Sequence, residues 1–155
     1  MAQRNNLAKF YKKLQKEIDK YTFVLSTELF IEGILSAESY SGRLIDYLID
    51  ERYYIALDDR IYLEYFTEIH RKKIEKKNID SLFAFLKEYG KFVTAKKIQM
   101  HGIHLGDSNF LKFIEVAKSS EANSIFILKT DAVKYGNIHL FTSVITPEEV
   151  FENFL

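Results

Sequence analysis

YYIALDDRIYLEY, residues 53–65, is the stretch on which the predicted fold class depends. Its two parts, YYIAL at 53–57 and RIYLEY at 60–65, have a period of two, which predicts two strands. Asp58 and Asp59 lie between the two parts, where a tight turn would join the strands into a β-hairpin. Two later apolar runs, SIFILKT at 124–130 and NIHLFT at 137–142, predict a second hairpin.

Helical periodicity surrounds both predicted hairpins. Before the first hairpin, apolar residues recur at helical spacing over 3–20, from Ser26 or Thr27 to Ile34, and in a third segment with Leu44 and Leu48. After it, helices are expected over 67–78, 79–89, 95–101 and 107–118, with a short strand at 92–94. Thr146 is expected to cap a last short helix that has Pro147 at its first position.

The order of elements predicts the same architecture twice. Three helices followed by a hairpin form a winged helix, so the expected fold class is α+β, mainly helical, with two tandem winged-helix domains. The first domain would span residues 1–66 and the second residues 79–155, with a basic linking helix over 67–78.

Composition excludes several classes of protein. The chain has 155 residues, of which 47% are hydrophobic and 28% charged, as in ordinary globular proteins. It has no cysteine, which excludes disulfide scaffolds and thiolate zinc sites, and no apolar run of about 18 residues. Met1 is followed by polar and basic residues rather than by a signal peptide, so a cytoplasmic protein without membrane contact is expected.

Charge alternates along the chain although the formal net charge is zero. The balance of Lys and Arg against Asp and Glu is +4 over residues 1–20, −6 over 21–66, +5 over 67–105 and −3 over 106–155. Binding of nucleic acid would therefore depend on the two basic segments. The alternative is that both are solvated helix faces.

TAKKIQMHGIHLGDSNFLKFIEVAK, residues 94–118, resembles the helix-turn-helix of DNA-binding winged-helix proteins. The resemblance implies a recognition helix in the major groove, with Ser108 and Asn109 facing outward and Asn109 reading a base edge. Phosphate contacts would come from this motif and from the linking helix, through Lys96, Lys97, Lys112, Arg71, Lys72 and Lys76. The alternative is a winged helix used for protein contacts.

The first predicted domain is suited to a protein partner rather than to nucleic acid. Its candidate contact residues are Tyr40, Arg43, Tyr47, Asp58 and Asp59, and the two aspartates at the expected wing tip would repel phosphate. A solvated acidic face is the alternative.

A fainter resemblance concerns the tandem winged-helix tail of the bacterial selenocysteine-specific elongation factor. DDRIYLEYFTEIHRKKIEK at 58–76 and FLKEYGKFVTAKKI at 85–98 are similar to its wing, linking helix and next domain start. The resemblance implies binding of RNA.

No catalytic motif is found in the sequence. A glycine-rich phosphate loop, a nucleophile elbow and a paired-carboxylate motif are absent, and His101 and His104 lack a third metal ligand at suitable spacing. We therefore expect no enzyme, cofactor or metal, but a regulatory protein that binds nucleic acid, DNA in preference to RNA. A protein adaptor is the first alternative, an RNA-binding translation-factor-like module is the second, and homodimer formation stays open.

Overall fold

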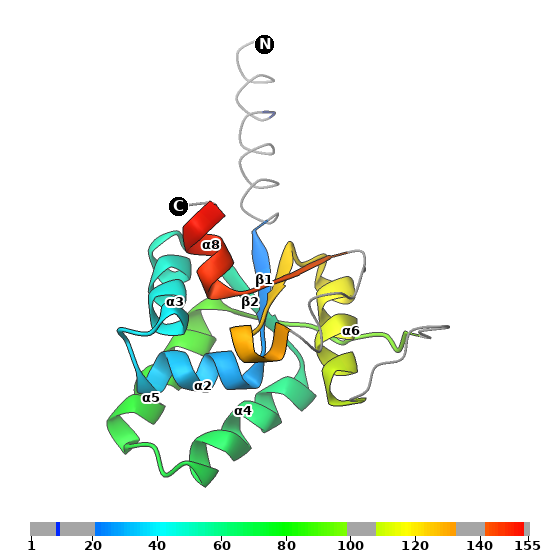
Figure 1. The fold of residues 1–155 in the computed structure, drawn as a ribbon. Helices are drawn as coiled ribbons and strands as arrows, with labels where there is room; N and C mark the ends of the chain where they lie inside the picture. The colour runs from blue at the N-terminus through cyan, green and yellow to red at the C-terminus, as the bar shows by residue number, and fades with distance from the viewer. Residues whose placement is uncertain (1–8, 10–20, 99–107, 133–141, 154–155) are drawn as a thin grey trace.

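Five parallel strands form one sheet at the centre of this computed structural model, which describes residues 9, 21–98, 108–132 and 142–153 (Figure 1). The strands, in chain order, are β1 (Thr22–Leu25), β2 (Tyr54–Leu57), β3 (Gly90–Phe92), β4 (Ser124–Phe126) and β5 (Ser143–Ile145). Their order across the sheet is β3-β2-β1-β4-β5, and each neighbouring pair is parallel. β1 is central, because Phe23 pairs with Ile55 of β2 on one side and with Ser124 of β4 on the other.

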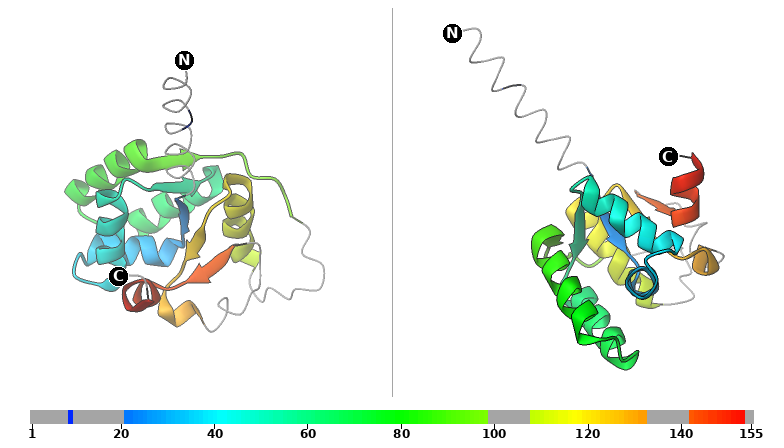
Figure 2. Two further views of the ribbon diagram at one scale, coloured as in Figure 1. Left: turned by 90° about the horizontal axis from the view of Figure 1, so that it is seen from above. Right: turned by 90° about the vertical axis from the view of Figure 1, so that its left-hand side faces the viewer.

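Helices cover both faces of the sheet. They are α2 (Thr27–Leu35), α3 (Tyr40–Asp50), α4 (Asp59–Arg71), α5 (Lys76–Tyr89), α6 (Leu111–Ser120) and α8 (Pro147–Asn153), with 3-10 turns η1 (Ser108–Phe110) and η2 (Lys129–Asp131). α6 packs against β1, β2 and β4, while α3 and α8 lie together on the opposite side (Figure 2). None of the helices among the described residues has the length and hydropathy needed to span a bilayer.

The prediction of two winged helices is wrong. A winged helix carries its strands in a small antiparallel hairpin, whereas this α/β fold has one parallel sheet with helices on both faces. The sheet also joins the two halves of the chain, since β1 and β2 come from the first half and β4 and β5 from the second.

The error begins at residues 60–65, which are helical rather than extended. Asp58 does not form a hairpin turn but caps α4, its carboxylate accepting a hydrogen bond from the amide of Ile61 at 3.0 Å. Ile61, Tyr65 and Ile69 then form the buried stripe of the helix, and Leu63 is left 63% exposed. The predicted strand would have buried Leu63 on the same face as Ile61.

Several other helix predictions agree with the structure. α2 and α3 begin one residue after Ser26 and Ser39, whose hydroxyls accept hydrogen bonds from amides in the first turn, and Thr146 does the same for α8. The linking helix over 67–78 is instead the end of α4, a connection, and the start of α5. Residues 95–98 are not helical, and the rest of the predicted 95–101 helix and the strand at 137–141 lie outside the described residues.

The parallel strands place all their carboxyl ends at one edge of the sheet. The chain runs outward from β1 to β2 and β3, then returns to β4 on the other side of β1. This makes the carboxyl ends of β1 and β4 a topological switch point, where ligands bind in open α/β sheets. The two strand ends are joined there by the Ser26 amide, which donates to the Phe126 carbonyl at 2.9 Å.

Candidate functional site

α4 carries polar side chains toward this carboxyl edge. The helix is anchored by Tyr65, which is buried, stacks on Phe30 of α2 with ring centroids 4.1 Å apart, and donates its hydroxyl to the Leu25 carbonyl. Glu64, the preceding residue, is thereby held beside the first turn of α2. This anchor lies in the core, so the position of Glu64 follows from core packing.

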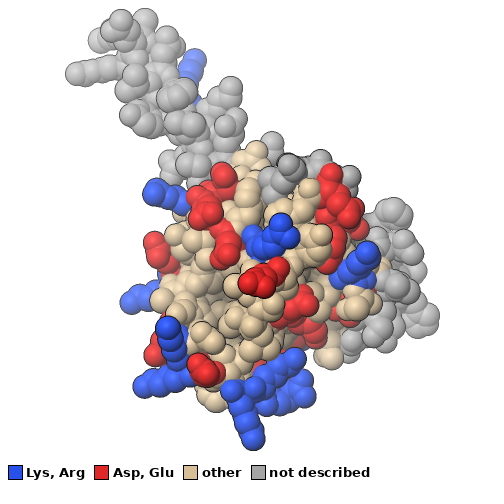
Figure 3. Space-filling model, turned by 60° about the vertical axis from the view of Figure 1, so that its left-hand side comes forward, with Lys and Arg blue, Asp and Glu red and all other residues tan. Residues whose placement is uncertain are grey.

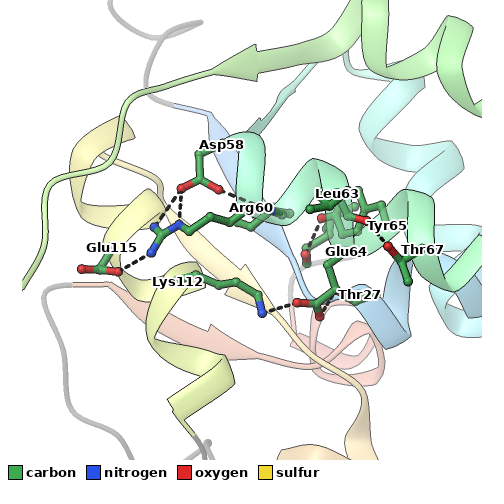
Figure 4. A network of polar contacts seen from close by, with 11 residues as sticks. Thr27, Asp58, Arg60, Leu63, Glu64, Tyr65, Thr67, Lys112 and Glu115 are labelled. Carbon is green, nitrogen blue, oxygen red and sulfur yellow. Dashed lines mark hydrogen bonds and ion pairs between the residues drawn. The ribbon is translucent and has the colours of Figure 1, made fainter.

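Glu64 is held on both oxygens (Figure 4). The Thr27 hydroxyl of α2 donates to its Oε1 at 2.6 Å, and the Lys112 ammonium of α6 contacts its Oε2. The Lys112 side chain is 15% exposed and that of Glu64 29%, so water screens this ion pair less than a surface pair. Three elements that are distant in the sequence therefore meet at one carboxylate.

A second ion-pair cluster lies beside the first. Arg60 of α4 contacts Asp58 and Glu115 with 2.8 Å ion pairs, and Figure 4 shows its guanidinium between the two carboxylates. Glu115 is buried on α6, and its other oxygen accepts the amide of Ile98 at 2.9 Å. Arg60 thus binds the end of β2, the helix α6 and the segment after β3 to one another.

Further carboxylates surround the switch point. Partial desolvation raises the pKa of Glu28 in the first turn of α2, and the charges of Asp131, Glu64 and Glu68 raise it further. These four acidic residues come from the segments after β1, β2 and β4. Two of these four carboxylates are paired, Glu64 with Lys112 and Glu68 with Arg71.

The structure separates the residues that the sequence grouped as a nucleic-acid surface. Arg71, Lys72 and Lys76 are exposed where α4 ends and α5 begins, and Lys96 and Lys97 are exposed on the segment after β3. Lys112 points to Glu64 rather than outward, and Ser108 and Asn109 belong to η1 before α6. Glu115, on the same helix as Lys112, is buried.

The residues predicted for a protein partner are separated as well. Tyr40 and Arg43 lie on α3, where the Arg43 guanidinium is 5.3 Å from the ring centroids of both Tyr40 and Phe151. Tyr47 lines an apolar cavity of about 260 Å³ between α3, α8 and the sheet. Asp58 is a buried helix cap and Asp59 the first residue of α4, so neither forms the predicted wing tip.

Comparison with known proteins identifies the family. A family model described as PIN domain matches residues 22–126. Among solved structures, the crystal structure of VapBC2 from Rickettsia felis bound to a DNA fragment from their promoter contains a chain of similar fold. Its TM-score is 0.56 at 14% identity, and the match covers 81% of this chain and 98% of that chain. No curated protein sequence matches the chain.

The family match overturns the functional expectations as well as the fold. PIN domains are typically metal-dependent nucleases, so the predictions of a DNA-binding transcription regulator and of a protein without enzymatic activity are wrong. The winged-helix adaptor and the resemblance to the elongation-factor tail are overturned with them, because both depend on winged helices that the chain does not form.

A resident divalent metal ion does not fit the described residues as they stand. They hold no cluster of three or more His, Asp or Glu side chains that could bind one. The residue after β1 is Ser26, whose Oγ accepts the Leu29 amide at 3.3 Å, and Glu64 already has a partner on each oxygen. His101 and His104 lie outside the described residues.

Proposed function

This chain belongs to the PIN-domain family, and from that premise we propose that it is a nuclease that cleaves phosphodiester bonds of RNA. The observation that carries the proposal is the position of Glu64. It is a carboxylate held against Lys112 beside the switch point, where a sheet of this topology binds its ligand. A base and a cation lie within reach of one bound phosphate.

The chemistry of the two side chains favours RNA over DNA. RNA carries its own nucleophile, the 2′-hydroxyl, so cleavage requires a base to take that proton and a cation to neutralise the phosphoryl oxygens. When a phosphate enters, the Lys112 ammonium can move from Glu64 to a phosphoryl oxygen, which frees the carboxylate to accept the proton. The 2′-oxygen then attacks phosphorus, and the 5′-oxygen leaves with a proton from water. The products are a 2′,3′-cyclic phosphate and a 5′-hydroxyl.

A basic cluster near the site supports binding of a polyanion. Its exposed members, at the corner between α4 and α5, are Arg71, Lys72, Lys73, Lys76 and Lys77. Figure 3 shows Lys and Arg side chains gathered at this lower end of the molecule. Glu64 and Arg71 are seven residues apart on α4, about 10 Å along its axis. Nucleotides adjoining the scissile bond could reach this cluster, and we assign phosphate contacts to Lys72 and Lys76.

The proposal includes a protein partner, which binds the surface formed by α3 and α8. Tyr40 is 45% exposed there and lies beside Arg43 and Phe151. Exposed aromatic rings next to an arginine are typical of residues that contribute strongly to protein interfaces.

The test is cleavage of a single-stranded RNA, with DNA of the same sequence as the second substrate. Both are incubated with the full chain in EDTA, in Mg²⁺ and in Mn²⁺, and the product ends are identified. We expect cleavage of RNA, and a loss of at least about 100-fold in rate for Glu64→Gln, the range that a general base contributes. Glu88→Gln, an exposed glutamate on α5, is the matched control and should cleave like the wild type.

Several outcomes contradict this proposal. RNA left intact under all three conditions would do so, and so would equal rates for Glu64→Gln and Glu88→Gln. Cleavage of DNA with RNA left intact would show that the substrate is DNA rather than RNA.

A further inference from the structure

The ammonium group of Lys112 occupies the position from which a bound cation would contact Glu64. It contacts Oε2, and Thr27 occupies Oε1, so both oxygens of the carboxylate are engaged by the chain itself. A divalent ion that ligates Glu64 through Oε2 must first displace Lys112, because two cations at one oxygen repel each other strongly at low exposure to water.

The surrounding charges explain why a cation is needed there. Glu28 interacts electrostatically with Glu64, Glu68 and Asp131, and Glu68 is paired with Arg71 at 2.8 Å. Without Lys112, Glu64 would be a partly buried carboxylate near Glu28 that has lost its paired cation. Lys112 is positioned to face it because α6 is fixed on the sheet by Phe113, Ile114 and Ala117, which are buried.

We propose that Lys112 is the resident cation of this site, which replaces a divalent metal at Glu64 and keeps the wild-type affinity for such ions low. The proposal uses the location of the proposed nuclease site but not its activity. It also accounts for the absence of a metal-binding carboxylate cluster among the described residues of a chain whose family is typically metal-dependent.

The experiment is titration of the full chain with Mn²⁺ alone, without RNA, followed by calorimetry and by the electron paramagnetic resonance of free Mn²⁺. Lys112→Met removes the charge and keeps most of the length of the side chain, so Mn²⁺ should bind at least about tenfold more tightly than to the wild type. Its Tm should be lower without metal and recover as Mn²⁺ is added, because binding to the folded state stabilises it. Lys112→Arg, which keeps the charge, should behave like the wild type.

Two controls locate the effect. Lys87→Met removes an exposed lysine of α5 and should leave Mn²⁺ affinity unchanged. Lys112→Met combined with Glu64→Gln should lose the gain, because the freed ligand is gone. If Lys112→Met does not fold, Lys112→Gln takes its place in the same titrations.

The proposal is overturned if the charge-removing variant binds Mn²⁺ no more tightly than the wild type, or if the double variant keeps the gain. Ion binding and RNA cleavage are measured separately. If Lys112→Met does not bind Mn²⁺ more tightly, the proposal that RNA cleavage depends on Glu64 is unaffected. If the protein does not cleave RNA, the Mn²⁺ comparison is still valid.

Discussion

Arg60 connects three parts of the chain through one guanidinium group. It pairs with Asp58 at the end of β2 and with buried Glu115 on α6, while Glu115 also accepts the amide of Ile98. Removing the arginine would leave a buried carboxylate with a hydrogen bond but without a counter-charge. Such a group costs more free energy than the lost contact itself, because its desolvation is no longer compensated.

Arg60→Met is therefore expected to lower the free energy of unfolding by about 2–3 kcal/mol. The Arg60 side chain is 46% exposed, so water offsets part of the loss and the larger values known for fully buried pairs do not apply. Urea denaturation measures the change. Arg60→Met combined with Glu115→Gln should recover stability, because glutamine keeps an acceptor for Ile98 without the charge. A double variant less stable than Arg60→Met would show that the uncompensated charge is not the cause.

Glu28→Gln is expected to stabilise the protein at neutral pH. The folded state raises the pKa of Glu28 above its ordinary value of 4.5, first by desolvation and then by Asp131, Glu64 and Glu68. For an acid, a raised pKa means that the folded state disfavours the charged form, so stability falls as pH rises through this range. The difference in Tm between variant and wild type should be present at pH 7 and vanish below about pH 4. A Glu28→Gln variant that is less stable than the wild type at pH 7 would contradict this prediction.

At the site, the sequence predicts a phosphate contact for Lys112 but not its ion pair with Glu64. Glu64 does not stand out in the sequence, because a strand over 60–65 makes it an ordinary surface residue. An aspartate cap after a short buried strand, as at Asp58, was the signal for a strand followed by a helix, which places Glu64 near a carboxyl edge.

At the scale of elements, α4 shows why periodicity alone did not decide the fold. Ile61, Leu63 and Tyr65 fit a period of two, whereas Ile61, Tyr65 and Ile69 fit a helical stripe. Both patterns include Ile61 and Tyr65. They differ in the third buried residue, which is Leu63 for a strand and Ile69 for a helix. α2, α3 and α8 were predicted correctly because each has a capping hydroxyl directly before its stripe.

Paired substitutions in α4 test the helix directly. Leu63→Gln should change the free energy of unfolding by less than about 0.5 kcal/mol, because Leu63 is exposed. Ile61→Ala should cost about 2–5 kcal/mol, because Ile61 is fully buried. Chemical denaturation of the two variants gives both values. Comparable losses at the two positions would indicate a strand with both residues on its buried face.

At the scale of the whole molecule, the parallel sheet could not be predicted from local patterns. β1 pairs with β4 about a hundred residues later, and the Thr22 amide donates to the Asn123 side chain over a separation of 101 residues. TFVL at 22–25 is too short to be identified as a buried strand without its neighbours. Strand pairing in a parallel sheet depends on such distant contacts, which a single sequence does not reveal.

A fragment of residues 1–78 should therefore not fold. It lacks β4 and α6, so one edge of β1 would be unpaired and the face of β1 and β2 under α6 would be exposed to water. Circular dichroism and proton NMR should show an unfolded or aggregated chain. A cooperatively folding fragment with dispersed amide signals would instead support an independent first domain.

Hydrogen exchange of the Glu64→Gln chain, with and without saturating single-stranded RNA, tests most directly whether the carboxyl edge is the nucleic-acid site. The substitution allows an intact RNA to remain bound. Slower amide exchange is predicted at the start of α2, in the first half of α4 and at η2, because these segments border the switch point. Protection confined to α3 and α8, with these three segments unchanged at saturation, would contradict the account.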